Sequence, residues 1–196
     1  MKQRIPTLLV LFLFLPSIAF AHTGIDQTAG FLHGLAHPIG GADHLLAMLA
    51  VGIWAAQIGG QALWRVTGTF VAVMLLGGLL GIANIPLPFI EEGILVSIVV
   101  LGILITGAFK IRLVYSCLLV GVFAIFHGYT HGSEMPTSIS AASYALGFVM
   151  ATAVLHLSGI GLAVLMKKTK VQMMGRFAGS TIALCGVYLA SQATFY

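Results

Sequence analysis

Residues 33–48 read HGLAHPIGGADHLLAM, a stretch that places three histidines and one aspartate within an otherwise apolar segment. An ionisable side chain near the centre of a bilayer costs roughly 2.5–3.5 kcal/mol on insertion scales. Several in one lipid-embedded helix are therefore expected to face the protein interior and to act together. Whether these groups lie in lipid or in water therefore decides both the fold and the function.

The composition is that of a membrane protein. Of the 196 residues, 59% are hydrophobic and only 7% are charged, with a mean hydropathy of +1.07. A soluble domain has about 25% charged residues. We therefore expect the lipid bilayer to be the solvent of this chain.

Residues 1–21 have the pattern of a signal peptide. Lys2 and Arg4 precede a short apolar run that ends in Ala19, Phe20 and Ala21, the small-x-small sequence of a cleavage site. The mature chain is then expected to begin at His22.

The rest of the chain, residues 22–196, is predicted to be one all-α domain, a permease-like bundle of six transmembrane helices. Each predicted span approaches or exceeds the roughly 20 apolar residues that a bilayer requires. The spans lie at about 27–57, 61–83, 90–109, 113–132, 138–166 and 173–194. Glycines at four-residue spacing should let these helices pack closely. The pairs are Gly30/Gly34, Gly77/Gly81, Gly128/Gly132 and Gly175/Gly179.

Charge predicts the orientation. The basic residues of the mature chain lie in or beside the first, third and fifth loops, and most acidic ones lie on the other side, namely Asp26, Glu91, Glu92 and Glu134. The positive-inside rule then places the protein in the inner membrane with both mature termini in the periplasm. No basic surface interleaved with aromatics indicates nucleic-acid binding. The cysteines, Cys117 and Cys185, lie inside predicted spans, where we expect them to pack as small apolar residues.

The opening stretch predicts a polar stripe within the first span. At 100° per residue, His33, His37 and His44 lie at relative angles of about 0°, 40° and 20°, with Asp43 about 80° to one side. One proline and two glycines intervene, so we expect the helix to kink or unwind there.

A second stripe lies in the fourth span. In FHGYTHGSE, residues 126–134, His127, His131 and Glu134 are spaced i, i+4 and i+7, which places them within about 60° of one another on a helix. His156 adds an imidazole in the fifth span. Together with the first stripe, these groups predict a polar path leading into the bundle.

Residue counting gives the expected order along this path. His37 and His127 should lie at similar depth in the outer half, with His44 and His156 deeper. Neutral imidazole with a few carboxylates suits Ni²⁺, Co²⁺, Zn²⁺ or Cu²⁺. A divalent transition metal is therefore the expected substrate.

Other interpretations use the same residue types. Any one histidine alone could be a satisfied core residue, and intramembrane histidines and acids also form proton relays or metal sensors. A membrane-embedded hydrolase would hold a zinc ion that activates water, and Ser133, Ser138 and Ser140 border the site. Nothing marks any of these serines as a nucleophile, so we do not expect an enzyme.

The two motifs, HPIGGADHLLAM and FHGYTHGSE, resemble the signatures of the HupE/UreJ family of hydrogenase and urease accessory proteins. The resemblance implies a secondary permease for Ni²⁺ or Co²⁺ that serves hydrogenase or urease maturation machinery. It implies that the metal is handled by His37, Asp43 and His44 of the first motif and by His127, His131 and Glu134 of the second.

His22 is a further candidate ligand. Its imidazole and the free amine of a mature N-terminus can chelate one ion, and Asp26 or His33 is close enough in sequence to add a third ligand. Such a site would capture metal before passing it to His37. The sequence contains no phosphate-binding G-x-x-x-x-G-K-[ST] loop, so we expect gradients to drive transport.

Overall fold

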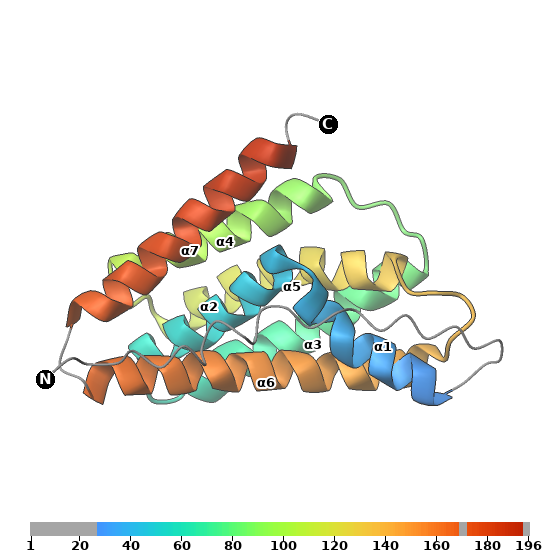
Figure 1. Cartoon of the computed structure of the whole chain (residues 1–196), viewed down its shortest axis with the longest axis horizontal. Helices are drawn as coiled ribbons and strands as arrows, with labels where there is room; N and C mark the ends of the chain where they lie inside the picture. Colours follow the sequence, from blue (N-terminus) through green and yellow to red (C-terminus); the bar gives the residue numbers. More distant parts are fainter. Residues whose placement is uncertain (1–26, 169–171, 194–196) are drawn as a thin grey trace, which may run out of the picture.

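The computed structural model describes residues 27–168 and 172–193, and all the regular structure in these two ranges is helical. The all-α prediction is therefore confirmed for this part of the chain. The helices are α1 (Gln27–Gly40), α2 (Ala42–Ile58), α3 (Ala62–Ile82), α4 (Ile90–Thr106), α5 (Leu113–Ser133), α6 (Ala141–Lys168) and α7 (Gln172–Ala193) (Figure 1). The predicted signal peptide and His22 lie outside the described residues.

The first predicted span is two helices. The axes of α1 and α2 differ by 83°, and Gly41 at the junction has an extended backbone with φ −105° and ψ 125°. Pro38 lies in the last turn of α1, where its ring removes a hydrogen-bond donor. The predicted break is confirmed. The helical angles between His37 and His44 do not hold, because helical periodicity does not continue through the break, although His33, His37 and His44 all line one cavity.

Among the described residues, four helices are long and apolar enough to cross a membrane by themselves, namely α3, α5, α6 and α7. The bent pair of α1 and α2 passes the same test as one broken span. Helix α4 is strongly apolar but has 17 residues, fewer than the roughly 20 of a typical span. The structure therefore supports a polytopic membrane protein, and six spans remain a prediction.

Glycines set the closest helix contacts, as predicted. A Cβ atom at Gly128 or Gly132 of α5 would collide with the backbone carbonyl of Met74 or Gly78 in α3. The glycines of α3 approach α5 in the same way, at Gly77 and Gly81. Close backbone approach of this kind stabilises helix pairs in lipid. Gly175 differs, since its nearest neighbour is the Gln57 side chain at 3.5 Å.

The remaining helices pair in a way that places α2 centrally. Helices α1 and α2 pack along α6, while α4 packs mainly on α7 (Figure 1). The side chains of Met48 and Trp54 in α2 are fully buried. The Trp54 indole donates a hydrogen bond to the carbonyl of Phe109 at 3.0 Å. The central helix is thus fixed by apolar packing and by a polar contact beyond the end of α4.

Successive helices from α3 to α7 run in alternating directions (Figure 1). Their alternation gathers charges of one sign at each end of the bundle. One end has Arg65, Lys110, Arg112, Lys167 and Arg176, and the other has Glu91, Glu92 and Glu134. We call these the basic end and the acidic end.

Candidate metal-handling site

A cavity of about 1050 Å³ opens at the acidic end of the bundle. It is bounded by the break between α1 and α2, the start of α4 and the last turns of α5 and α7. Its polar lining residues are His33, His37, Asp43, His44, Glu91, Thr130, His131 and Glu134. The two sequence motifs, far apart in the chain, therefore line one space, which we call the histidine cavity.

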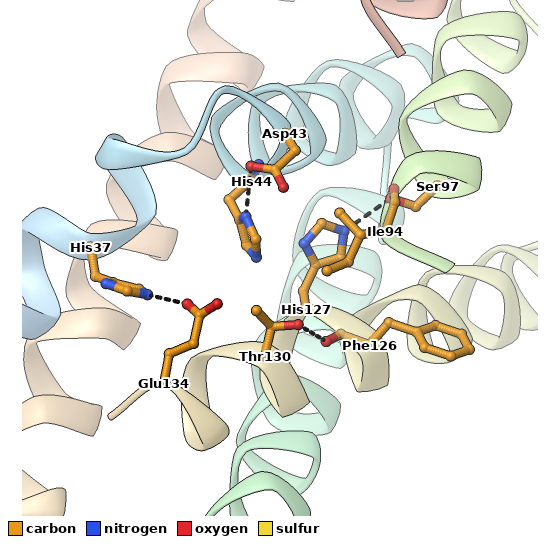
Figure 2. A network of polar contacts seen from close by, with 9 residues as sticks. All are labelled: His37, Asp43, His44, Ile94, Ser97, Phe126, His127, Thr130 and Glu134. Carbon is orange, nitrogen blue, oxygen red and sulfur yellow. Dashed lines mark hydrogen bonds and ion pairs between the residues drawn. The ribbon is translucent and has the colours of Figure 1, made fainter. Parts of the chain in front are cut away.

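The rim of the histidine cavity joins the two motifs directly. His37 Nε2 and Glu134 Oε2 lie 3.2 Å apart (Figure 2). The His33 ring stacks near His37, with 6.0 Å between ring centroids, and the buried Tyr144 ring lies 5.9 Å from His37. This rim is partly exposed, since the side chain of Glu134 is 56% accessible.

The first motif also forms a carboxylate–imidazole pair further in. Asp43 Oδ1 lies 2.8 Å from His44 Nδ1 and also accepts from the His44 backbone N–H at 2.8 Å. An ionised carboxylate only accepts hydrogen bonds, so Nδ1 of His44 bears the hydrogen. Its other nitrogen, Nε2, has no hydrogen-bond partner among the residues that the structure describes.

Three more ring contacts connect the motifs into a cluster of four imidazoles. The ring centroids of His44 and His131 are 4.2 Å apart, those of His44 and His127 are 4.9 Å apart, and those of His37 and His131 are 4.8 Å apart. His127 is completely buried, and His131 is 3% exposed. We call the four residues joined by these ring contacts the imidazole cluster: His37, His44, His127 and His131.

The imidazole cluster has several buried nitrogens with no partner within the described ranges: Nε2 of His44, Nδ1 of His127 and both ring nitrogens of His131. A buried polar atom without a partner is costly and rare in native proteins. The imidazole cluster therefore has lone pairs available to a ligand.

The order of the rings differs from the residue count. His37 lies beside His131 and Glu134, whereas His127 lies one helical turn deeper and beside His44. The prediction that His37 and His127 share a depth is wrong, because the break in the first span carries α1 and α2 in different directions. Beyond His127, Phe70 separates the imidazole cluster from His156, with centroid distances of 5.8 Å and 5.2 Å.

His156 is the innermost predicted site residue. It is 2% exposed, and neither of its ring nitrogens has a partner in the described part of the chain. Among the described residues no ring contact joins His156 to the imidazole cluster, and Phe70 contacts the rings of both His156 and His127.

Within residues 27–168 and 172–193, no three His, Cys, Asp or Glu side chains are arranged to hold a metal ion together. The available donors instead occur as neighbouring pairs along a line.

Several residues around the site were not predicted as site residues, among them Glu91 and Thr130 of the cavity lining and three others. The Ser97 hydroxyl of α4 bonds His127, Phe70 of α3 separates two imidazoles, and Tyr144 of α6 has a buried hydroxyl with no partner among the described residues. Of these, Ser97 had a usable signal: apart from residues in its first and last turns, it is the only polar residue of α4.

A second cavity, of about 420 Å³, lies at the basic end. Its lining includes Gln57, Lys110, Lys167 and Arg176. The two cavities share no lining residue. Each end of the bundle thus has its own cavity, and several side chains of α2 and α3 are completely buried.

These features define a polytopic helical membrane protein with a buried cluster of imidazoles that is reached from one end. The HupE / UreJ protein family matches residues 9–189. The chain is 47% identical to Protein HupE of Rhizobium leguminosarum bv. viciae over 177 residues, which cover 90% of this chain and 92% of that protein. The chain therefore belongs to the HupE/UreJ family. No solved structure matches it.

Proposed function

We propose that this protein is a secondary permease that moves a divalent transition metal ion, Ni²⁺ or Co²⁺, across the inner membrane. The observation that supports this most directly is the line of imidazoles from His37 to His127, with unpartnered ring nitrogens buried inside the bundle. Intramembrane ionisable groups are costly, and they commonly belong to ion pathways or proton relays.

The donor set suits this substrate. Neutral imidazole with a few carboxylates binds Ni²⁺ and Co²⁺ well and also accepts Cu²⁺ and Zn²⁺. Acidic groups at the mouth of the histidine cavity, Glu91 and Glu134, raise the local concentration of cations. Conduction requires sites that bind weakly enough to release the ion, and donors arranged in neighbouring pairs fit that requirement.

The transport path begins in the periplasm. In this proposal α1 and α2 form one broken span and α4 completes six, the signal peptide is removed, and both mature termini are periplasmic. Discontinuous helices recur at the substrate sites of secondary transporters. His22 captures metal at the mouth, and hydrogenase or urease maturation machinery receives it inside.

A hydrolase is less well supported. Ser97 Oγ lies 2.9 Å from His127 Nε2, which is a distance suited to a nucleophile and its base. However, Ser97 and His127 are both completely buried, and the Ser97 hydroxyl lies 2.6 Å from the carbonyl of Ile94. Of the serines beside the second motif, Ser133 donates to the Thr130 carbonyl and is exposed. The hydrogen bond of Ser133 is to a backbone carbonyl and not to a histidine that could activate it.

Metal uptake by the purified protein in sealed vesicles tests the proposal. We expect Ni²⁺ to accumulate in vesicles containing the full chain, to respond to an imposed pH gradient or membrane potential, and to fall to background with His44→Ala. Proton flux that needs no metal would instead indicate a proton relay. Zinc-dependent cleavage of a lipid or peptide would indicate a hydrolase. Either result without metal uptake would overturn the permease.

A further inference from the structure

We propose that Ser97, which belongs to neither motif, is a positioning residue that fixes the tautomer of His127 so that Nδ1 faces the ion. The inference rests on the proposed function for its ligand, a divalent transition metal. The Ile94 carbonyl, the Ser97 hydroxyl and the His127 ring are joined in one chain of hydrogen bonds (Figure 2).

The direction of this chain follows from the hydrogens available. Ser97 Oγ and the Ile94 carbonyl oxygen are 2.6 Å apart. Two oxygens at that distance repel unless a hydrogen lies between them, and the carbonyl has none. The single hydroxyl hydrogen of Ser97 is therefore donated to Ile94.

The remaining lone pairs of Ser97 Oγ can only accept. His127 Nε2 lies 2.9 Å away, so it must be the donor and must bear the ring hydrogen. In a neutral imidazole the other nitrogen then has a lone pair. For His127 that nitrogen is Nδ1, which has no partner within the part of the chain that the structure describes.

In this tautomer the lone pair of His127 Nδ1 is directed toward the imidazole cluster. In Figure 2 the free nitrogen of His127 lies on the side of the ring that faces His44. The two rings are 4.9 Å apart and nearly perpendicular, at 89°. Asp43 fixes the tautomer of the neighbouring His44 ring, whose Nε2 is likewise without a partner among the described residues.

Two separate hydrogen bonds therefore orient two neighbouring imidazoles. The Asp43 carboxylate fixes the tautomer of His44, and the Ser97 hydroxyl, on a different helix, fixes that of His127. Partners of this kind fix the tautomer and ring orientation of metal-binding histidines, and their loss typically costs about 10–100-fold in metal affinity or activity. We expect that range for Ser97→Ala.

The test compares the full-length protein with Ser97→Ala and with Ser97→Thr, which keeps a hydroxyl. Ser116→Ala is the matched control, because Ser116 is equally buried and its hydroxyl, within the described part of the chain, bonds the backbone carbonyls of Ile111 and Arg112 and no histidine. Nitrogen-15 NMR of labelled histidine in the metal-free protein reports the tautomer, and calorimetric titration with Ni²⁺ reports affinity.

We expect a hydrogen on Nε2 of His127 in the wild type, in Ser116→Ala and in Ser97→Thr. Ser97→Ala should show Nδ1–H or a mixture, with Ni²⁺ affinity reduced about 10–100-fold. A hydrogen on Nδ1 in the wild type would overturn the inference, as would unchanged tautomer and affinity in Ser97→Ala. Absence of Ni²⁺ and Co²⁺ binding by the wild type would refute the proposed function instead, and the NMR would still decide the tautomer.

Discussion

Asp43 orients His44 and also brings a negative charge, and two variants separate these effects. Asp43→Asn keeps an oxygen that can accept from Nδ1 of His44, whereas Asp43→Ala removes it. We expect Asp43→Ala to lower Ni²⁺ uptake about 10–100-fold and Asp43→Asn to lower it less. Uptake per unit of inserted protein is the measurement. Equal losses in both variants would show that charge, and not orientation, is what the ion requires.

The acidic residues at the mouth should affect capture more than passage. Glu91 and Glu134 line the histidine cavity, whereas Glu92, at the same end, does not. Because fixed charges raise the local cation concentration, we expect Glu91→Gln and Glu134→Gln to raise the Ni²⁺ concentration for half-maximal uptake with little change in the maximal rate.

Glu92→Gln is the matched control for these charge variants, since it removes the same charge from an exposed position beside Glu91. It should leave the half-maximal concentration near the wild-type value. Added salt should shrink the effect of the other two variants, because salt screens exposed charges. Equal effects of all three would point to net surface charge and not to the cavity.

At the residue scale, the sequence singled out histidines and acids of two motifs, and the structure brings these motifs together, but the spacing did not predict which side chains would touch. Residue types and spacing give the cost of burying these groups and the class of metal ion that imidazole and carboxylate ligands would suit. The pairs His37–Glu134 and His44–His127 depend on the angle of the helix break, which no spacing encodes. Ser97 could not be linked to His127 from sequence, because 30 residues and a helix connection separate them.

At the scale of helices, the contact between α3 and α5 gives a direct test. Gly128→Ala places a Cβ against the carbonyl of Met74, where only backbone movement can relieve the collision. Overpacking of this kind costs about 1–3 kcal/mol. Thermal unfolding in detergent should therefore show a lower midpoint. The control is Gly68→Ala in α3, where nothing lies within 4 Å of the added atom, and it should unfold at or above the wild-type temperature.

The break between α1 and α2 could be predicted only in part. Pro38 and the glycines that follow it indicate that a continuous helix is unfavourable. The 83° angle depends on where each half packs, and both halves lie along α6 through close glycine contacts, at Gly34 and Gly52. Packing against α6, which is distant in the sequence, therefore determines the angle between α1 and α2 that the local sequence does not specify.

At the scale of the whole molecule, the separation of charge predicts which end faces which compartment. After replacement of Cys117 and Cys185, a single cysteine at Glu92→Cys should react with a membrane-impermeant thiol reagent added from the periplasmic side. Lys167→Cys should react only after the membrane is opened, because the positive-inside rule places the basic end in the cytoplasm. The reverse pattern would invert the proposed orientation.

The pairing of helices was the least predictable feature at this scale. Apolar length predicts that a segment spans, and alternating loops predict antiparallel neighbours. Neither predicts that α4 packs mainly on α7, which follows it only after two intervening helices. That pairing follows from small residues on both helices, since Gly102 and Gly179 bring their backbones together.

The placement of Ser97 on α4 joins the α4–α7 pair to α5 through one side-chain hydrogen bond. Helices α4 and α7 pack chiefly on each other, while the histidine that Ser97 orients belongs to α5. A tilt of the α4–α7 pair that lengthens this contact would let His127 exchange its ring hydrogen between nitrogens. The ion would then lose an oriented donor at the moment the helices move, so that a change in shape would act as a change in affinity.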